Sequence, residues 1–216
     1  MFVVPFRDEE EQRHQMPAVV EHVRDGGLLL YPTETVYGLG GQASAAAVER
    51  LAALKGRAAA QSFLLLVARP DAVEGVEWTD CARRLADAFW PGALTLVLPS
   101  HEGAFPPGVR SADGGVAVRQ SPHPVVARLL DALGEPITST SANLTGEPPA
   151  RSAQEALSLL KRLSAEDTEV WMLNGGDAPG GTPSTVVDCR GEPRVLREGA
   201  VDVQLLRSVI EEIRPG

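Results

Sequence analysis

Short apolar runs of β type alternate with amphipathic helical stretches along nearly the whole chain. This alternation is typical of an α/β domain, in which helices cover a sheet, rather than of a protein whose strands and helices form separate layers. Several of the apolar runs have no polar face, as expected for a sheet that is buried on both sides. The expected strands are at 28–31, 63–68, 95–98, 115–118, 136–140, 169–173, 184–188 and 194–197.

Three of the expected helices carry end signals. Ser44 is placed to cap a helix that ends near the basic pair at 55–57. Ser152 and Glu155 have the spacing of a capping box, and Gly134 is placed to close a helix that begins at a proline near 122–124. Two further helices are expected, at about 80–90 and 203–213.

The composition limits the class of protein. The chain has 216 residues, of which 44% are hydrophobic and 23% charged, and these proportions exclude disorder as the state of the whole chain. The formal charge of −9 argues against a protein that coats nucleic acid or an anionic membrane through its overall field, although a local basic pocket remains compatible with it. Because the Pro- and Gly-rich stretches are too short to be convincing linkers, we expect one domain over residues 1–216.

The cysteines and the amino terminus indicate the compartment. Cys81 and Cys189 lie far apart in the sequence and form no CxxC pair, so neither a disulfide framework nor a zinc site is signalled. The first residues lack the basic start and apolar stretch of a secretion signal, and the apolar runs fall far short of the roughly 18 residues that a membrane helix needs. We therefore expect a cytoplasmic protein that does not contact the membrane.

The segment 30–40, LYPTETVYGLG, is a strand that runs into a turn rich in hydroxyl groups. Hydroxyls and free backbone amides beyond a strand end suit a small polar ligand, because open α/β sheets bind ligands there. An ordinary strand exit followed by a turn explains the segment equally well. Gly38, Gly40 and Ala43 imitate a dinucleotide fingerprint, but no second strand with an acidic end follows about 20 positions later, which rejects that interpretation.

Basic side chains stand at the ends of two other segments. Lys55-Gly56-Arg57 could bind phosphates, although basic residues at the end of a helix also complement its macrodipole. Arg119 ends an apolar strand, where it is badly placed for solvation unless it lines a cleft, and a structural ion pair is the competing explanation. His123 stands between two prolines, and stabilisation of the turn fits it better than a role as a base.

Residues 137–146, ITSTSANLTG, carry six small polar side chains, an unusual density that suits a polyanionic or zwitterionic ligand. A hydrolase would use one of these serines as its nucleophile, but the chain has no GxSxG elbow and no assignable base and orienting group. The segments 180–188 and 195–199 each add Ser, Thr or Arg at a turn or a strand end. Because a sheet can gather such ends, we expect one shared pocket.

Taken in order, the segments PTETVYGLG, KGR, AVR with a following HP, STSAN, PSTVVD and LREG resemble the motif series of the Sua5/YrdC/TsaC family, the threonylcarbamoyl-AMP synthases. The resemblance extends from about Leu28 to Gly199. It implies a YrdC-like α/β fold, in which a twisted, mixed, open sheet is flanked by helices around a concave cleft. Longer family members carry an additional carboxyl-terminal domain, whereas this chain resembles the short form with the catalytic domain only.

The resemblance also implies a reaction that combines L-threonine, bicarbonate and ATP into threonylcarbamoyl-adenylate and pyrophosphate. Mg²⁺ would be bound by the ATP phosphates rather than by protein side chains, and no organic cofactor is implied. Partner proteins would transfer the threonylcarbamoyl group to an adenosine of certain tRNAs, and direct contact with tRNA stays open. Such chemistry needs positioning and charge stabilisation rather than a protein nucleophile, in agreement with a pocket of cations and hydroxyls.

The family pattern assigns roles residue by residue. The residues implied at the threonine end are Thr33, Thr35, Arg119, Thr140 and Ser184. The residues implied to bind the nucleotide are Lys55, Arg57, Ser139, Ser141, Asn143 and Arg197. Arg119 is implied to neutralise the threonine carboxylate or the carbamate. Lys55 and Arg57 are implied to offset charge on the phosphates and the leaving pyrophosphate.

The chain departs from the family pattern after KGR. Family members usually continue with Pro and then a Lys-Pro-Leu step, whereas this chain has three alanines followed by Gln61, Ser62 and Phe63. The family's Pro-Gly-Pro is Pro-Gly-Ala at 91–93. These changes bear on nucleotide affinity and keep open a paralogue with weak or altered activity.

Two other functional classes stay open. One is an RNA-binding, translation-associated module that uses the concave basic surface of the family's domain on double-stranded RNA. The acidic composition weakens this alternative, because nonspecific RNA affinity relies on neutralising phosphates. The other is a carbamoyl-transfer domain of the hydrogenase-maturation type, which normally belongs to a far longer chain with zinc-finger cysteines.

Overall fold

The protein, represented by a computed structural model that describes residues 2–56, 62–163 and 169–214, has the predicted α/β architecture. The strands in these ranges are β1 (Phe2–Pro5), β2 (Leu28–Pro32), β3 (Tyr37–Gly41), β4 (Leu64–Leu66), β5 (Leu94–Pro99), β6 (Gly115–Arg119), β7 (Ile137–Ser141), β8 (Val170–Asn174), β9 (Thr185–Asp188) and β10 (Arg194–Arg197). The helices are α1 (Glu9–Arg24), α2 (Ala45–Lys55), η1 (Pro70–Ala72), α3 (Asp80–Phe89), α4 (Pro124–Leu133), α5 (Ala153–Leu163) and α6 (Val203–Val209). No helix in the described ranges is long and apolar enough to cross a membrane.

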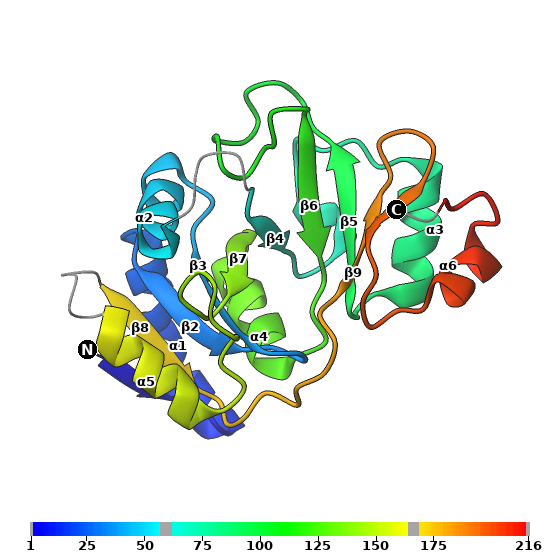
Figure 1. Cartoon of the computed structure of the whole chain (residues 1–216). Coiled ribbons are helices and arrows are strands. Elements are labelled where there is room, and N and C mark those ends of the chain that lie inside the picture. The colour runs from blue at the N-terminus through cyan, green and yellow to red at the C-terminus, as the bar shows by residue number, and fades with distance from the viewer. Residues whose placement is uncertain (1, 57–61, 164–168, 215–216) are drawn as a thin grey trace.

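The ten described strands form one mixed, open sheet in the order β1-β8-β2-β3-β7-β4-β6-β5-β9-β10. The strand β7 joins the two halves, because it pairs antiparallel with β3 on one side and with β4 on the other. Figure 1 shows that β5 and β6 run in a clearly different direction from β2 and β8, as the twist of an open sheet requires. The hydroxyl-rich segment therefore lies at the centre of a strongly twisted sheet.

Helices cover both faces of the sheet (Figure 1). The side chains of β2 alternate between two cores: Leu28 and Leu30 belong to one, and Leu29 and Tyr31 to the other. The helices α1 and α4 pack over the core that holds Leu29, while α2, α3, α5 and α6 contribute to the core that holds Leu28. Every residue of β2 is buried, which confirms the prediction of a strand enclosed on both faces.

The helix-end signals are confirmed. The hydroxyl of Ser44 accepts a hydrogen bond from the amide of Ala47 at 3.3 Å, and Gly134 ends α4 in the left-handed conformation with φ 72°. The capping box is also formed, because the Glu155 amide donates to Ser152 Oγ at 3.1 Å and the Ser152 amide donates to Glu155 Oε2 at 3.2 Å. The last helix is shorter than predicted and ends at Val209.

Four elements were not expected from the sequence, namely β1, α1, β3 and η1. The predicted turn after β2 is in fact followed at once by β3, whose glycines allow close approach of its neighbours. A Cβ atom on Gly40 would lie 1.7 Å from the carbonyl oxygen of Thr138, and one on Gly38 would lie 2.7 Å from the ring of Tyr31. These glycines therefore belong to a tightly paired strand rather than to a flexible turn.

We expect Asp8→Ala to lower the free energy of unfolding by about 1 kcal/mol, because Asp8 is the N-cap of α1. Its carboxylate accepts a hydrogen bond from the Glu11 amide at 2.9 Å, and alanine leaves that amide without its cap. Urea denaturation followed by circular dichroism measures the change. Replacement of the exposed Asp87 in α3 by alanine is the matched control, and an equal effect of both substitutions would contradict the capping role.

Candidate active site

A cavity of about 450 Å³ lies where the two halves of the sheet meet. Its wall is formed by the β2–β3 turn, the end of β6, the second half of β7 and the start of β9, with a side chain from the end of β10. Eight of the eleven predicted site residues line it, namely Thr33, Thr35, Arg119, Ser139, Thr140, Ser141, Ser184 and Arg197. Segments more than 160 residues apart in the sequence thus share one cavity.

The β2–β3 turn is shaped by the hydroxyl of Thr33. This hydroxyl donates to the carbonyl of Val36 at 2.7 Å and accepts a hydrogen bond from the amide of Thr35 at 3.2 Å. The hydroxyls of Thr33 and Thr35 lie 3.2 Å apart. Both threonines are buried, so their hydroxyl groups are held in a fixed position at the cavity wall.

Arg119 is buried, with 6% of its surface exposed, and forms an ion pair with Glu34 through Nη2 and Oε1. The other carboxylate oxygen of Glu34 accepts a hydrogen bond of 2.5 Å from Ser121 Oγ. Burial lowers the pKa of Arg119 to about 10, and the charge of Arg197 acts in the same direction. Because this pKa still lies well above neutral pH, the guanidinium stays charged there. Among the described residues, Nε of Arg119 has no hydrogen-bond acceptor. A buried donor without an acceptor is costly unless a ligand supplies one.

Arg197, Ser184 and Thr95 form a second polar group in the cavity wall. Arg197 donates to the carbonyl oxygen of Ser184 from Nη2 at 2.8 Å and from Nε at 3.2 Å. The hydroxyl of Ser184 lies 2.9 Å from that of Thr95 on β5 and accepts from Arg197 Nη2 at 3.1 Å. Burial lowers the pKa of Arg197. Two guanidinium groups, those of Arg119 and Arg197, therefore line the cavity, and both favour an anionic ligand.

Lys55 lies behind the cavity wall rather than on it. Its ammonium group donates to the carbonyls of Ser141 at 2.9 Å and Asn143 at 2.6 Å, and to the side-chain oxygen of Asn143 at 2.7 Å. The hydroxyl of Ser141 donates to the same Asn143 oxygen at 2.7 Å. Thr145 in turn donates to the carbonyl of Lys55. Lys55 thus ties the end of α2 to the segment 141–145 and acts on the cavity through Ser141.

Asn143 adjoins the cavity through Ser141 and is not part of its lining. Arg57, and Gln61 at the departure from the family pattern, lie outside the described residues, so their predicted contributions stay predictions.

His123 is the N-cap of α4, and its Nδ1 accepts a hydrogen bond from the Val125 amide at 3.3 Å. Burial lowers the pKa of His123, and the turn-stabilising interpretation is confirmed.

Sequence reasoning missed several residues of the site. Glu34 stands between the two predicted threonines, and Ser121 follows Arg119 by two positions, so their position within the motifs was the available signal. Thr95 had no signal beyond its place in an apolar strand. Tyr31 does not line the cavity, but its hydroxyl donates a hydrogen bond of 2.8 Å to Ser139 Oγ and so orients that side chain. Tyr37 donates to the carbonyl of Gly176 at 2.5 Å and so joins the site to the loop after β8.

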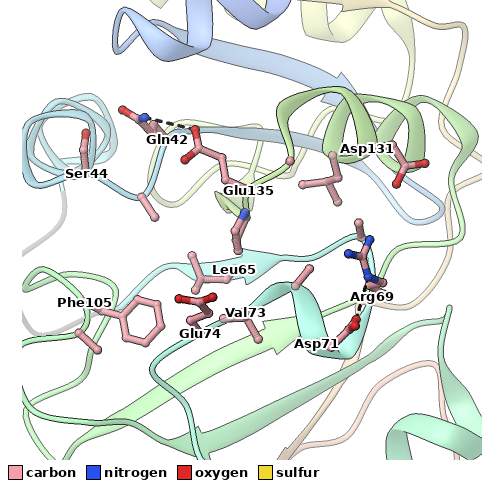
Figure 2. Close-up of a pocket in the computed structure, with 17 residues that line it drawn as sticks. Gln42, Ser44, Leu65, Arg69, Asp71, Val73, Glu74, Phe105, Asp131 and Glu135 are labelled. Carbon is pink, nitrogen blue, oxygen red and sulfur yellow. Dashed lines mark hydrogen bonds and ion pairs between the residues drawn. The ribbon is translucent and has the colours of Figure 1, made fainter.

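A larger cavity of about 660 Å³ lies elsewhere, between β4, η1 and the end of α4 (Figure 2). It contains none of the predicted site residues. Its walls carry Asp71, Glu74, Asp131 and Glu135, while its Arg69 is paired with Asp71 at 2.9 Å. This excess of carboxylates disfavours a nucleotide or an amino-acid carboxylate, so the smaller, cationic cavity is the better candidate.

Comparison with known proteins agrees with this choice. A family profile named Sua5_yciO_yrdC, with the description "Telomere recombination", matches residues 21–199. A threonylcarbamoyl-AMP synthase of Pyrococcus abyssi is 37% identical over 89% of this chain, which spans only 56% of that relative. A threonylcarbamoyl-AMP synthase of Stenotrophomonas maltophilia is 43% identical over 68% of this chain and 82% of its own length.

Solved structures have the same fold. The chain superimposes on the structure of P. abyssi Sua5 complexed with L-threonine with a TM-score of 0.89 and 32% identity, covering 100% of this chain and 63% of that one. It superimposes on E. coli YciO with a TM-score of 0.79 and 28% identity, covering 95% of this chain and 98% of that one. The chain is therefore similar to one protein of nearly equal length and to part of a longer one.

Proposed function

The chain belongs to the Sua5/YrdC family, and on that premise we propose that it forms threonylcarbamoyl-AMP and pyrophosphate from L-threonine, bicarbonate and ATP. The observation that supports this most directly is the cavity in which eight predicted residues meet around the buried Arg119. Its relatives include threonylcarbamoyl-AMP synthases and a protein whose structure contains L-threonine.

The proposed reaction is a nucleotidyl transfer. The amine nitrogen of threonine forms a C–N bond with bicarbonate, a C–O bond breaks and water leaves, which gives a carbamate. One oxygen of this carbamate attacks the α-phosphorus of ATP. The new P–O bond forms as the bond to the β-phosphate oxygen breaks, and the electron pair leaves with pyrophosphate. Because charge moves between anionic oxygens, positioned cations and hydroxyls can supply the catalysis without a protein nucleophile.

We assign the threonine end to Thr33, Thr35, Arg119, Thr140 and Ser184. The buried Nε of Arg119, which has no acceptor among the described residues, suits a carboxylate or a carbamate. The hydroxyls of the threonine side chains in the cavity wall can accept from an ammonium or donate to an anion. Glu34 does not line the cavity, and its ion pair with Arg119 holds the guanidinium in place. Glu34 is therefore a positioning residue of the proposed site.

We assign the nucleotide to Ser139, Ser141, Asn143 and Arg197, together with Arg57. Lys55 has a different part in this proposal from the one that its motif implies. Its bonds to Ser141 and Asn143 favour a positioning role, in which it holds the nucleotide side of the wall rather than contacting phosphate. Ser62, which replaces the family's proline, lies at the cavity wall.

The proposal includes Mg²⁺ as the counter-ion of ATP, bound by the phosphates, and requires no organic cofactor. The described residues contain no group of three or more His, Cys, Asp or Glu side chains arranged to hold a metal ion. The product is a reactive mixed anhydride, so we propose that partner proteins consume it and transfer the threonylcarbamoyl group to tRNA.

The test is mass spectrometry of the products after the purified protein is incubated with ATP, bicarbonate, Mg²⁺ and L-threonine. We expect threonylcarbamoyl-AMP only when all four components are present, with pyrophosphate in equal amount. If ATP and threonine bind but no adenylate forms, the alternative of a paralogue with altered activity is favoured. If neither binds while tRNA binds with a steep dependence on salt, the RNA-binding alternative is favoured.

A further inference from the structure

The two cysteines of the chain lie side by side, although 108 positions separate them in the sequence. Cys81 is the second residue of α3, and Cys189 directly follows β9. Their Sγ atoms are 3.8 Å apart. Thr79, the N-cap of α3, donates a hydrogen bond of 3.1 Å to the carbonyl of Cys189 and so holds the two segments together. The sequence separation concealed this contact.

We propose that Cys81 and Cys189 form an oxidation site, at which a peroxide converts the two thiols into an intramolecular disulfide. Cys81 is partly exposed and Cys189 is buried, so the oxidant meets Cys81 first. The Cys81 thiolate attacks the peroxide, the O–O bond breaks, and Cys81 becomes a sulfenic acid. The sulfur of Cys189 then attacks Cys81 Sγ, the S–S bond forms, and the S–O bond breaks. With hydrogen peroxide, the two thiols supply two electrons and two protons, and two water molecules leave.

The surroundings distinguish the two thiols. The hydrogen bond between them lowers the pKa of Cys81, and the charge of Arg84 acts in the same direction, whereas burial and the charge of Glu212 oppose this shift. The start of α3 also favours a thiolate at Cys81, because amide groups point toward negative charge there. The same hydrogen bond and burial raise the pKa of Cys189. Cys81 is therefore suited to react with the oxidant and Cys189 to resolve the sulfenic acid.

The disulfide would attach a wall of the cavity to α3. A disulfide has a sulfur–sulfur distance of about 2.05 Å, so the two atoms must move closer together than they are in the thiol form. The strand β9 is paired with both β5 and β10, so the first turn of α3 is the part that can move. Val186 on β9 and Ser184 just before it line the cavity, so the cross-link would restrain that wall. This inference does not rest on the proposed activity.

The test is to treat the full chain with hydrogen peroxide and to compare it, before and after a thiol reductant, with Cys81→Ser and Cys189→Ala. We expect the wild type to lose the mass of two hydrogen atoms, to give a cross-linked peptide that contains both cysteines, and to gain about 5 °C or more in Tm. The reductant should reverse all three changes, and neither variant should show them. Cys81→Ser alters a partly exposed position, so it remains an informative control if the core variant does not fold.

Three outcomes would overturn the proposal. The first is that Cys81 reaches the sulfinic acid while Cys189 keeps a free thiol. The second is that cross-links form only between two molecules, as a doubled mass on non-reducing gels would show. The third is that both thiols remain unmodified at peroxide concentrations that oxidise a free cysteine peptide.

Discussion

Replacing Arg119 by alanine is expected to reduce the rate of threonylcarbamoyl-AMP formation by at least about 100-fold, or about 2.7 kcal/mol of transition-state stabilisation. The guanidinium is the buried cation of the cavity, and its Nε lacks an acceptor among the described residues. Alanine removes the group that we assign to the threonine carboxylate or the carbamate. Threonine-dependent release of pyrophosphate measures the effect, and the KM for threonine should rise while kcat falls.

The control has to separate this effect from a loss of stability, because alanine also leaves Glu34 buried without its partner. Arg119→Lys retains the charge beside Glu34 but loses the planar fork, so we expect it to fold and still to lose much of the activity. Arg69→Ala removes an arginine that is 65% exposed in the acidic cavity and should leave the rate unchanged. A folded Arg119→Ala protein with the wild-type rate would exclude Arg119 from the site.

Replacing Lys55 by alanine is expected to lower both stability and activity. The ammonium group satisfies two backbone carbonyls and the side chain of Asn143, and Lys55 is only 3% exposed. Leaving buried acceptors without a donor costs about 2–4 kcal/mol, which corresponds to a fall in Tm of about 5 °C or more in a chain of this size. Because the lost bonds hold Ser141 and Asn143, the KM for ATP should rise more than the KM for threonine. Thermal denaturation and initial rates with each substrate varied provide the measurements.

Lys161 supplies the matched control, since it is the other lysine of the chain and lies exposed on α5. Lys161→Ala should leave both Tm and the kinetic constants near their wild-type values. If Lys55→Ala kept the wild-type Tm and lost activity only through kcat, Lys55 would instead act directly on the phosphates. That result would restore the role that the KGR motif alone implies.

The elements that the sequence predicted well are those whose signals lie within a few residues of one another. Ser44 and Gly134 mark helix ends through bonds and backbone angles that are local, and the structure has both. The elements that it missed depend on distant partners. β1 pairs with β8, about 170 positions away, and β3 needs its glycines only because β2 and β7 approach so closely. The helix α1 contains Pro17 in its interior, where proline is locally unfavourable.

The sequence predicted most of the residues that line the candidate site, but it did not predict how their side chains pair with one another. Hydroxyl and basic side chains at strand ends indicated a polar pocket, and the cavity does contain both. No local pattern indicated that Glu34 pairs with Arg119, or that Lys55 points at backbone carbonyls behind the wall. Both facts depend on which segments are neighbours in the sheet.

By itself, the sequence determined the class of fold, the helix ends and the kinds of side chain available to a ligand, because these follow from hydrophobic periodicity, capping chemistry and residue type. Only the tertiary structure decided which of those side chains meet, which of them have partners, and that Cys81 lies against Cys189. The reason is physical, because strand order and twist bring together residues more than 100 positions apart. The free energies of burial and pairing that select such contacts depend on several segments at once, so no single segment determines them.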